Sequence, residues 1–523
     1  MTFRSKRLNS FKAELKLVFP KTLFHVFYIC FSGLVGLYLY RPMKELDFFW
    51  RIILGESLTS NTKTESNSLP TWGNYDGDWK TTQPLGEVLL SIMYKFGGLE
   101  LVSIGRIAVW TYFAWWIYQQ LLIQKRSQEI GLFTQLIITI YALTNVFLFL
   151  PFIQERPQTI FLVLLVIVGR NLAEVFMSSR VNIKTTTWLI LLISVLIHPA
   201  WVIIYVILFF QLVRRVLQSS KLKLKEFALL LVIPVLPILG PSGINYYLNL
   251  IEISKLGRLF IVEWQPLWRM DLSQPVLLLF VIQLVLVLFI GINLAGNLSI
   301  EKRFLFFTFL ILLQTFATLA ARNIPITIIL SSSLLSVVIS SNKSNLDWFQ
   351  NTNSKMAHNF SNIENLPTPL KAIPLAFFVV SLSVTVSHSF KATEDFALVA
   401  PIKIIQSMKE LGNSIVLNTS NEGGYLHYFG GSLVYPFMDG RIDRYTSDQF
   451  KILDSLFSSK TGVNELNREE FNQATEILIP RDNPLRPDQK SGFRFICQEN
   501  GYLWYSRQNG ASCSNSWGGK RGS

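Results

Sequence analysis

The sequence has little cysteine, little histidine and few charged residues for its length. Its 523 residues include three cysteines and five histidines, and only 16% are Asp, Glu, Lys or Arg. Three cysteines exclude a disulfide-stapled framework, and no zinc-site spacing is present. Cys30 lies in an apolar run. Cys497 and Cys513 lie near the C-terminus and either pair in an oxidising compartment or stay free.

Several functional motifs are also missing. The sequence has no Walker A loop, Rossmann fingerprint or nucleophile elbow, so ATP-driven transport and soluble nucleotide-sugar chemistry have no support. No small-residue cleavage site follows the first apolar run, and we expect that run to be retained as a membrane span. The formal net charge of +14 is mostly a topology signal, and we expect no nucleic-acid partner.

Long apolar runs fill the first three quarters of the chain. Hydrophobic residues make up 50% of it, with 40 Phe and 13 Trp, more than a soluble core normally needs. Roughly 20 apolar residues cross a bilayer core of about 30 Å. This predicts a polytopic α-helical membrane protein with about eleven spans, with loose boundaries, at 22–40, 99–123, 131–151, 158–176, 186–197, 200–213, 227–240, 274–296, 304–320, 325–341 and 370–389. The pair flanking His198-Pro199 is either two spans, one kinked helix or a re-entrant hairpin.

Basic residues indicate the orientation, because short cytoplasmic loops retain Lys and Arg. They precede the first span and recur in alternate loops, at Arg4, Lys6, Arg7, Lys12, Lys16, Lys21, Lys125, Arg126, Arg180, Lys184, Arg214, Arg215, Lys221, Lys223, Lys225, Lys302 and Arg303. We therefore expect a cytoplasmic N-terminal tail at 1–21 that also touches anionic headgroups. A transmembrane core at 22–341 and a Ser/Asn-rich cytoplasmic linker at 342–369 follow, and 370–389 is the last span.

The opposite face receives the unusual polar residues. They belong to different loops but share the predicted outer side: Asp47, Glu56, Glu87, Glu155, Arg156, His198, Glu263 and Arg322. One extracytoplasmic cavity would gather them, and ionisable groups near membrane depth favour a functional site.

The first outer loop, 41–98, is too long for a simple connector. Residues 44–58 predict an amphipathic helix in the membrane interface, with an apolar side formed by Leu46, Phe49, Trp50 and Ile53. The run 84–96 predicts a second interfacial helix, which contains Glu87.

After residue 390 the hydropathy drops, and we predict a small extracytoplasmic α/β domain over 390–523. The pattern favours a helix, a strand and a closing hairpin at Ile402–Leu411, Ser414–Asn418, and Phe493–Cys497 with Tyr502–Tyr505. The run Asp439-Gly440-Arg441 is either a structural turn or a segment that binds acceptor or caps a site.

A set of short motifs resembles the GT-C superfamily of integral membrane glycosyltransferases, in an uncharacterised bacterial polytopic subgroup. The family typically shows an Asp-x-x-Trp-His-x-x-x-Gly-Glu run in the first loop, and this chain has Asp47-Phe-Phe-Trp50-Arg51-Ile-Ile-Leu-Gly55-Glu56, with Arg51 where His is usual. The resemblance continues through Gln83-Pro-Leu-Gly-Glu87-Val-Leu-Leu, Gln154-Glu155-Arg156-Pro157-Gln158, Glu263-Trp264, Arg322-Asn323-Ile324-Pro325 and Asp439-Gly440-Arg441.

The resemblance implies a GT-C-like fold that moves a sugar from a polyprenyl-phosphate donor to a glycan, lipid or protein acceptor. The reaction would take place at the outer face of the inner or plasma membrane. In such enzymes a first-loop carboxylate acts as general base or holds a divalent metal, and Asp47 is the matching position; the sequence leaves the metal open. A base must lie within hydrogen-bond reach of the acceptor hydroxyl.

The other candidates have more than one interpretation. Glu56 is the second catalytic candidate, and substrate-binding candidates are Arg51, Glu87, Glu155, Arg156, His198, Glu263 and Arg322. Arg forks suit a donor phosphate. Glu155 and Arg156 are alternatively a local ion pair, and His198 alternatively caps or packs. A lipid or glycan transporter or flippase, and a non-catalytic membrane assembly protein, are the other functional classes.

Overall fold

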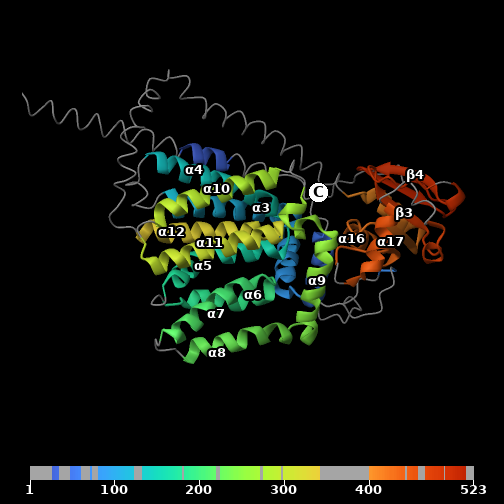
Figure 1. Cartoon of the computed structure of the whole chain (residues 1–523). Helices are drawn as coiled ribbons and strands as arrows, with labels where there is room; N and C mark the ends of the chain where they lie inside the picture. The colour runs from blue at the N-terminus through green and yellow to red at the C-terminus, as the bar shows by residue number, and fades with distance from the viewer. Residues whose placement is uncertain are drawn as a thin grey trace, which may run out of the picture.

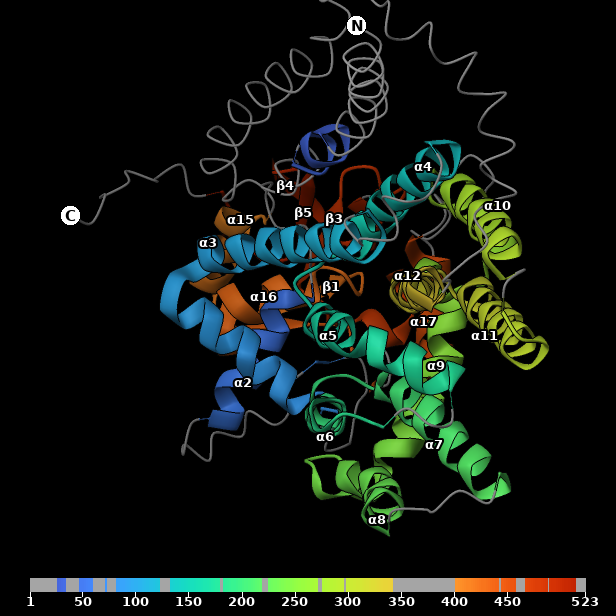
Figure 2. The same cartoon turned by 90° about the vertical axis from the view of Figure 1, so that its left-hand side faces the viewer.

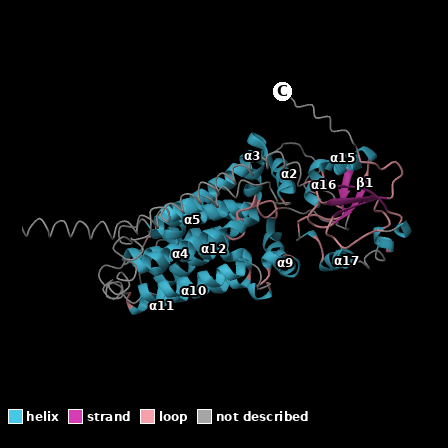
Figure 3. Ribbon diagram, turned by 90° about the horizontal axis from the view of Figure 1, so that it is seen from above, coloured by secondary structure: helices cyan, strands magenta, loops and turns pink. Residues whose placement is uncertain are grey.

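The computed structural model describes residues 26–33, 47–59, 71–72, 81–122, 132–178, 182–218, 224–270, 275–295, 298–341, 400–441, 444–457, 466–487 and 489–513. These residues form a bundle of helices and a smaller part built on a β-sheet, which lies beyond one end of the long helices (Figures 1 and 3). The predicted tail 1–21, linker 342–369 and span 370–389 lie outside the described residues.

The helical part runs from the first loop to residue 341. Its α-helices are α2 (Phe48–Thr59), α3 (Pro84–Ile117), α4 (Leu132–Phe149), α5 (Pro157–Met177), α6 (Thr185–Ile197), α7 (Trp201–Leu217), α8 (Leu224–Val232), α9 (Tyr246–Phe260), α10 (Pro275–Ala295), α11 (Ile300–Leu319) and α12 (Ile324–Ser341). Short helical turns important for the site are η5 (Val262–Trp264) and η7 (Ala321–Asn323). Figure 2 looks along several of these helices and shows α5 and α12 inside the bundle.

The protein is an integral membrane protein by the length and apolar character of its helices. In the described ranges, four helices are long and apolar enough to cross a bilayer, or up to six if each of two bent pairs is one span. Leu136–Phe152 and Thr185–Ile197 are apolar but shorter. The predicted total of about eleven crossings is not confirmed.

Helices α5 and α12 pack closely because small residues line their contact. Ser331, Ser332 and Ser333 of α12 are fully buried, and a Cβ at Gly169 of α5 would lie 2.7 Å from Ser333 Oγ. Small side chains let helix backbones approach in a membrane, where apolar burial alone gives little drive for association. Tyr141 of α4 adds a buried hydrogen bond to Ser331, 3.1 Å between the hydroxyl oxygens.

The first-loop helix α2 is covered by other parts of the protein, and its position in the membrane interface stays a prediction. Phe48, Phe49 and Ile52 are buried, and α2 packs against α3. A Cβ at Gly55 would overlap the Glu87 carbonyl oxygen and lie 2.6 Å from Ser91 Cβ. The sequence pattern showed the apolar side of α2. It did not show that the C-terminal sheet domain covers the helix in addition to α3.

Two breaks shape the helical part. The backbone of α3 is non-helical at Gly97 and at Gly98, whose φ of 59° favours glycine. The segments on either side are bent by 111°, which agrees with the predicted separate helix at 84–96 before the apolar run at 99–123. The predicted outer loop after the 227–240 span contains the helix α9, and Gly243–Leu259 is bent by 113° from Lys225–Leu239.

The C-terminal part is a five-stranded mixed sheet with helices on both sides. Its elements are α15 (Ile402–Leu411), β1 (Ser414–Asn418), α16 (Gly423–Gly430), β2 (Val434–Pro436), α17 (Ser447–Phe457), β3 (Glu476–Pro480), β4 (Arg494–Glu499) and β5 (Tyr502–Ser506). The strand order is β2-β1-β3-β5-β4; β1 pairs in parallel with β2 and β3, while β5 is antiparallel to β3 and β4. The predicted helix, first strand and closing hairpin are confirmed. Cys497 and Cys513 form a disulfide.

The two faces of the sheet contact different partners, because side chains alternate along a strand. Ile477 and Ile479 of β3 belong to a core with α17. Leu478, between them, belongs to a second core, which includes residues of α15 and α16 and also Phe48, Phe49 and Ile52 of α2. The sheet domain and the first-loop helix therefore share one hydrophobic core.

Candidate active site

Asp47, Arg156 and Glu263 form a line of charges at the sheet-domain end of the helices. Asp47 precedes α2, Arg156 is the N-cap of α5 and Glu263 is in η5. Arg156 Nη1 donates to Glu263 Oε1 at 2.6 Å, and Arg156 Nη2 lies 3.9 Å from Asp47 Oδ2. Their side chains keep 23%, 22% and 25% of their surface exposed for Asp47, Arg156 and Glu263. These three side chains are partly exposed, so a substrate can reach them.

Arg51 lies deeper than this line. Its guanidinium carbon is 4.3 Å from the centre of the Trp50 ring, and its Nη1 is 3.6 Å from Glu87 Oε1 of α3. Both charged side chains are almost fully buried. Gly86 lets the start of α3 approach α5, since a Cβ there would lie 2.5 Å from Pro157 Cβ. Close helix packing brings the Arg51–Glu87 pair beneath Arg156.

Arg322 provides a third cation, held by aromatic and neutral groups. Its guanidinium carbon lies 3.8 Å from the centre of the Trp264 ring, a cation–π contact. Its Nη2 is 3.4 Å from Gln158 Oε1 and 3.5 Å from His198 Nε2. These contacts are with a carboxamide, an imidazole and an indole, and the Glu263 carboxylate also acts on the charge of Arg322. An anion bound at this point would meet the Arg322 guanidinium.

The charges of this cluster act on one another. Burial raises the pKa of Glu263, but the nearby guanidinium groups of Arg156, Arg322 and Arg51 outweigh burial and hold that pKa below its ordinary value. Glu263 is therefore ionised at neutral pH and keeps Arg156 in place.

His198 has the capping and packing role that the sequence allowed, and it also faces the cluster. It ends α6, and its Nδ1 accepts a hydrogen bond from the backbone N–H of Ala200 at 3.2 Å. Its ring stacks on Phe161 at 5.8 Å between centroids. The remaining nitrogen, Nε2, faces Arg322. The histidine caps a turn and also lines the cluster.

Two predicted site residues lie outside the cluster. Glu155 pairs with Arg106 of α3 at 2.6 Å, with both side chains buried, so the alternative of a local pair with Arg156 does not hold. Glu56 is exposed on α2, about two and a half turns after Asp47 at 3.6 residues per turn, and its charge reaches Tyr428 of α16. The structure brings together Asp47, Arg51, Glu87, Arg156, His198, Glu263 and Arg322.

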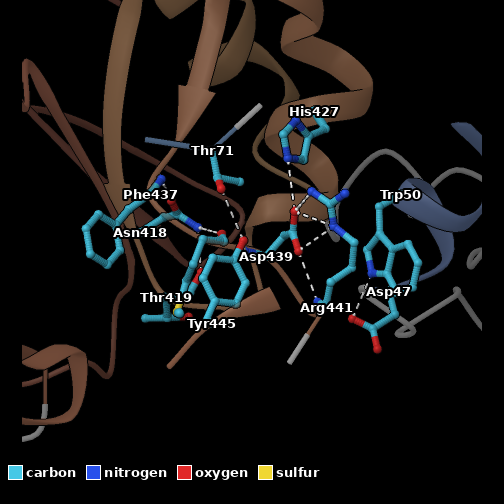
Figure 4. A network of polar contacts seen from close by, with 11 residues as sticks. Asp47, Trp50, Thr71, Asn418, Thr419, His427, Phe437, Asp439, Arg441 and Tyr445 are labelled. Carbon is cyan, nitrogen blue, oxygen red and sulfur yellow. Dashed lines mark hydrogen bonds and ion pairs between the residues drawn. The ribbon is translucent and has the colours of Figure 1, made fainter. Parts of the chain in front are cut away.

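The C-terminal domain contributes a backbone contact that the sequence did not identify. A Cβ at Gly440 would overlap Asp47 Oδ1 and lie 2.8 Å from Asp47 Cγ and 3.2 Å from Trp50 Nε1. The Trp50 indole N–H donates to the same Oδ1 at 3.2 Å. Figure 4 shows Asp47 and Trp50 beside the Asp439–Arg441 segment. Gly440 lies in a quoted motif, but only the fold shows what the glycine touches.

The donor set around Asp47 does not suit a divalent metal. Hard cations need several oxygen ligands. The described residues contain no group of three or more His, Cys, Asp or Glu side chains with suitable geometry. Glu263 and Glu87 each face an arginine, and the guanidinium groups already supply the positive charge here. We therefore derive no step through a metal.

Comparison with known proteins finds a likeness at the level of structure. No protein-family model matches the chain, and no curated protein matches it by sequence. The chain is similar to the crystal structure of ArnT from Cupriavidus metallidurans bound to undecaprenyl phosphate, with 11% sequence identity and a TM-score of 0.42. The match covers 93% of this chain and 98% of that one. The functional proposal rests on the geometry of the cluster.

Proposed function

We propose that the protein is a membrane glycosyltransferase that moves a sugar from a polyprenyl-phosphate donor to an acceptor at the outer face of the membrane. The observation that carries this proposal is a partly exposed carboxylate, Asp47, 3.9 Å from Arg156 at the end of apolar helices, with Arg322 close enough to Arg156 and Glu263 for their charges to interact. The motifs that resemble GT-C glycosyltransferases supply these residues.

The arrangement fits a donor with an anionic head and an apolar tail. Arg322 and Arg156 would bind the phosphate through charge-assisted hydrogen bonds. The apolar helices end at this phosphate site, so their surfaces would hold the polyprenyl chain that is attached to the phosphate. The acceptor would enter from the exposed side of Asp47 and Glu263.

Asp47 acts as the general base in this proposal. The acceptor oxygen attacks the anomeric carbon of the sugar, its proton passes to Asp47, and the bond from the anomeric carbon to the phosphate oxygen breaks. The polyprenyl phosphate leaves with that electron pair, and the arginines stabilise its charge. General acid–base catalysis by a group within hydrogen-bond reach of the hydroxyl typically raises the rate by about 10²- to 10⁴-fold.

The charge distribution favours this reaction class over transport. The site charges lie at helix ends, whereas transporters place binding groups near the bilayer midplane. Helix α7 starts next to His198 and ends at the ion pairs Arg214–Glu301 and Arg215–Glu226. From Trp201 to Arg215 the helix rises about 21 Å at 1.5 Å per residue, so the two charged levels are well separated along the helix axis instead of meeting near a midplane.

Two observations support the outer face as the side of the site. Arg214 and Arg215, which the sequence predicts to be cytoplasmic, lie in the last turn of α7, at the other end of that helix from His198. The Cys497–Cys513 disulfide in the sheet domain is of the kind that persists in oxidising compartments.

The test is transfer from a panel of labelled polyprenyl-phosphate sugars by the purified protein in lipid, with Asp47→Asn beside the wild type. We expect one donor to be turned over, and the variant to lose at least about 10²-fold in kcat with donor binding retained. Glu56→Gln is the matched control, because Glu56 is exposed on α2 and has no contact with the cluster residues among those that the structure describes.

Equal rates for wild type and Asp47→Asn would reject Asp47 as the base. If neither protein binds or turns over any donor, the transferase proposal fails and the transporter and assembly classes move ahead.

A further inference from the structure

The segment Asp439-Gly440-Arg441 contacts Asp47 at Oδ1, whereas Arg156 approaches Oδ2. Gly440 has no side chain, and its place against Asp47 Oδ1 leaves no room for one. The carboxylate is therefore confined between the Trp50 indole, the Arg156 guanidinium and the backbone at Gly440. A loop of the sheet domain thus takes part in fixing the atom proposed to accept the proton.

This segment is held by a buried ionic network of its own. Asp439 and Arg441 are fully buried, and Arg441 Nε lies 2.9 Å from Asp439 Oδ1 and 3.0 Å from Oδ2, while Arg441 Nη2 also donates to Oδ2. His427 Nε2 of α16 is 3.1 Å from Asp439 Oδ2. The Arg441 backbone N–H donates to Asp439 Oδ1 at 3.0 Å. Figure 4 shows the His427 and Arg441 side chains converging on the Asp439 carboxylate.

The network fixes the charge as well as the shape of the loop. Burial alone would raise the pKa of Asp439, but the Arg441 guanidinium and the hydrogen bond from His427 hold it far below its ordinary value. The backbone N–H of Asp439 donates to the Tyr445 hydroxyl at 3.0 Å. A carboxylate satisfied on this many sides restricts the positions its loop can take.

An aromatic contact docks the domain onto the first loop. The Phe49 ring of α2 lies 5.2 Å from Tyr425, 5.2 Å from Tyr428 and 5.3 Å from Phe429, all on α16. The Tyr428 hydroxyl donates to the Tyr94 hydroxyl of α3 at 2.8 Å. This packing, together with the shared core, sets the height of the 439–441 segment above Asp47.

We propose that residues 439–441 are a positioning element for Asp47, with Gly440 as the contact residue and Asp439, Arg441 and His427 as its support. The expected effect of residues 439–441 on kcat rests on the proposed transferase function. Their contact with Asp47 does not depend on that function. Misplacement of a catalytic group by about 1 Å can cost about 10²-fold in rate. A side chain at 440 should therefore lower kcat without touching the donor site.

The geometry is tested without any activity, by crosslinking Asp47→Cys with Gly440→Cys in lipid. A sulfur at the place of Asp47 Cγ would lie 2.8 Å from the Cβ at 440, close enough to form an S–S bond of about 2.05 Å. We expect a linked peptide by mass spectrometry under mild oxidation. Asp47→Cys with Lys451→Cys, exposed on α17 on the other side of the sheet, should not link. No link in the first pair would overturn the proposal.

The effect on Asp47 is tested by Gly440→Ala. We expect kcat to fall by about 10²-fold, a donor KM within about threefold of the wild type, and a changed pH profile of kcat. The matched control is Gly430→Ala, whose Cβ would meet Val434 within the domain, 2.7 Å from Cγ2. Gly430→Ala should lower the unfolding midpoint at least as much while retaining kcat.

The outcomes separate the two proposals. A linked pair with no transfer by the wild type would reject the transferase function and keep the docked geometry. Wild-type kcat in Gly440→Ala, or an equal loss of kcat in Gly430→Ala, would overturn the positioning role while leaving the transferase function in place.

Discussion

At the scale of single residues, the environment of Asp47 depends on neighbours far apart in the chain. Trp50 is one helical turn away, whereas Arg156 and Gly440 come from the start of α5 and from the sheet domain. The motif around Asp47 identified the carboxylate as a candidate. Its contacts with a guanidinium and with a glycine backbone could only be found once those segments were placed in space.

A second buried carboxylate makes a prediction about pH. Glu476 of β3 accepts hydrogen bonds from the Trp504 indole at 2.6 Å and the Ser506 hydroxyl at 3.0 Å. Burial outweighs these bonds and raises the pKa of Glu476 to about 7. Its folded pKa thus exceeds the ordinary value of about 4.3. The neutral carboxyl group therefore contributes its full stabilising free energy below a pH of about 4.3, and this contribution is lost as the pH rises through about 7.

We therefore expect the wild-type protein to be less stable at pH 8 than at pH 5, with up to about 3 kcal/mol of the difference from Glu476. Glu476→Gln should reduce the difference, measured as the unfolding midpoint in detergent at both pH values. Some dependence should remain, because burial also raises the pKa of Glu422 to about 7. An unchanged pH dependence in Glu476→Gln would contradict the assignment.

At the scale of elements, the contact between α2 and α16 joins the two parts of the molecule. The sequence predicted α2 as a helix at the membrane interface from its pattern, but not its contact with α16. An apolar helix side binds lipid or protein equally well on pattern alone. Strand alternation and turn residues did predict β1 and the β4–β5 hairpin, because hairpin pairing is local.

Phe49→Ala should destabilise this contact. The Phe49 ring is buried among three aromatic side chains. We therefore expect the free energy of unfolding to fall by about 3–5 kcal/mol, the usual range for Phe→Ala in a core. We expect a lower unfolding midpoint and faster proteolysis of the sheet domain. Phe495→Ala is the matched control, because Phe495 is 56% exposed on β4. Similar losses in both variants would show that α2 does not anchor the domain.

At the scale of the whole molecule, the two ends of the helix bundle differ in chemistry. One end has the Asp47 cluster and the sheet domain, and the other has the ion pairs of Arg214 and Arg215. The distribution of Lys and Arg predicts that the second end faces the cytoplasm. The orientation of the termini stays a prediction.

Labelling with a membrane-impermeant maleimide tests the orientation in intact cells, in a Cys30→Ser background. Lys451→Cys, exposed on α17, should be labelled without permeabilisation. Lys302→Cys, exposed at the start of α11, should be labelled only after permeabilisation. The reverse result would place the site in the cytoplasm and remove the outer-face part of the functional proposal.

The sequence by itself determined the membrane class, several helices and strands, and most of the cluster residues. Apolar length, strand alternation and the position of charges at span ends are local properties that can be recognised in the sequence. They identified the candidate residues from Asp47 to Arg322. Only the tertiary structure decided that Glu155 pairs with Arg106, that Arg322 lies on Trp264 and that Gly440 confines Asp47. These contacts join segments distant in sequence, and their geometry depends on how the helices and the sheet pack together.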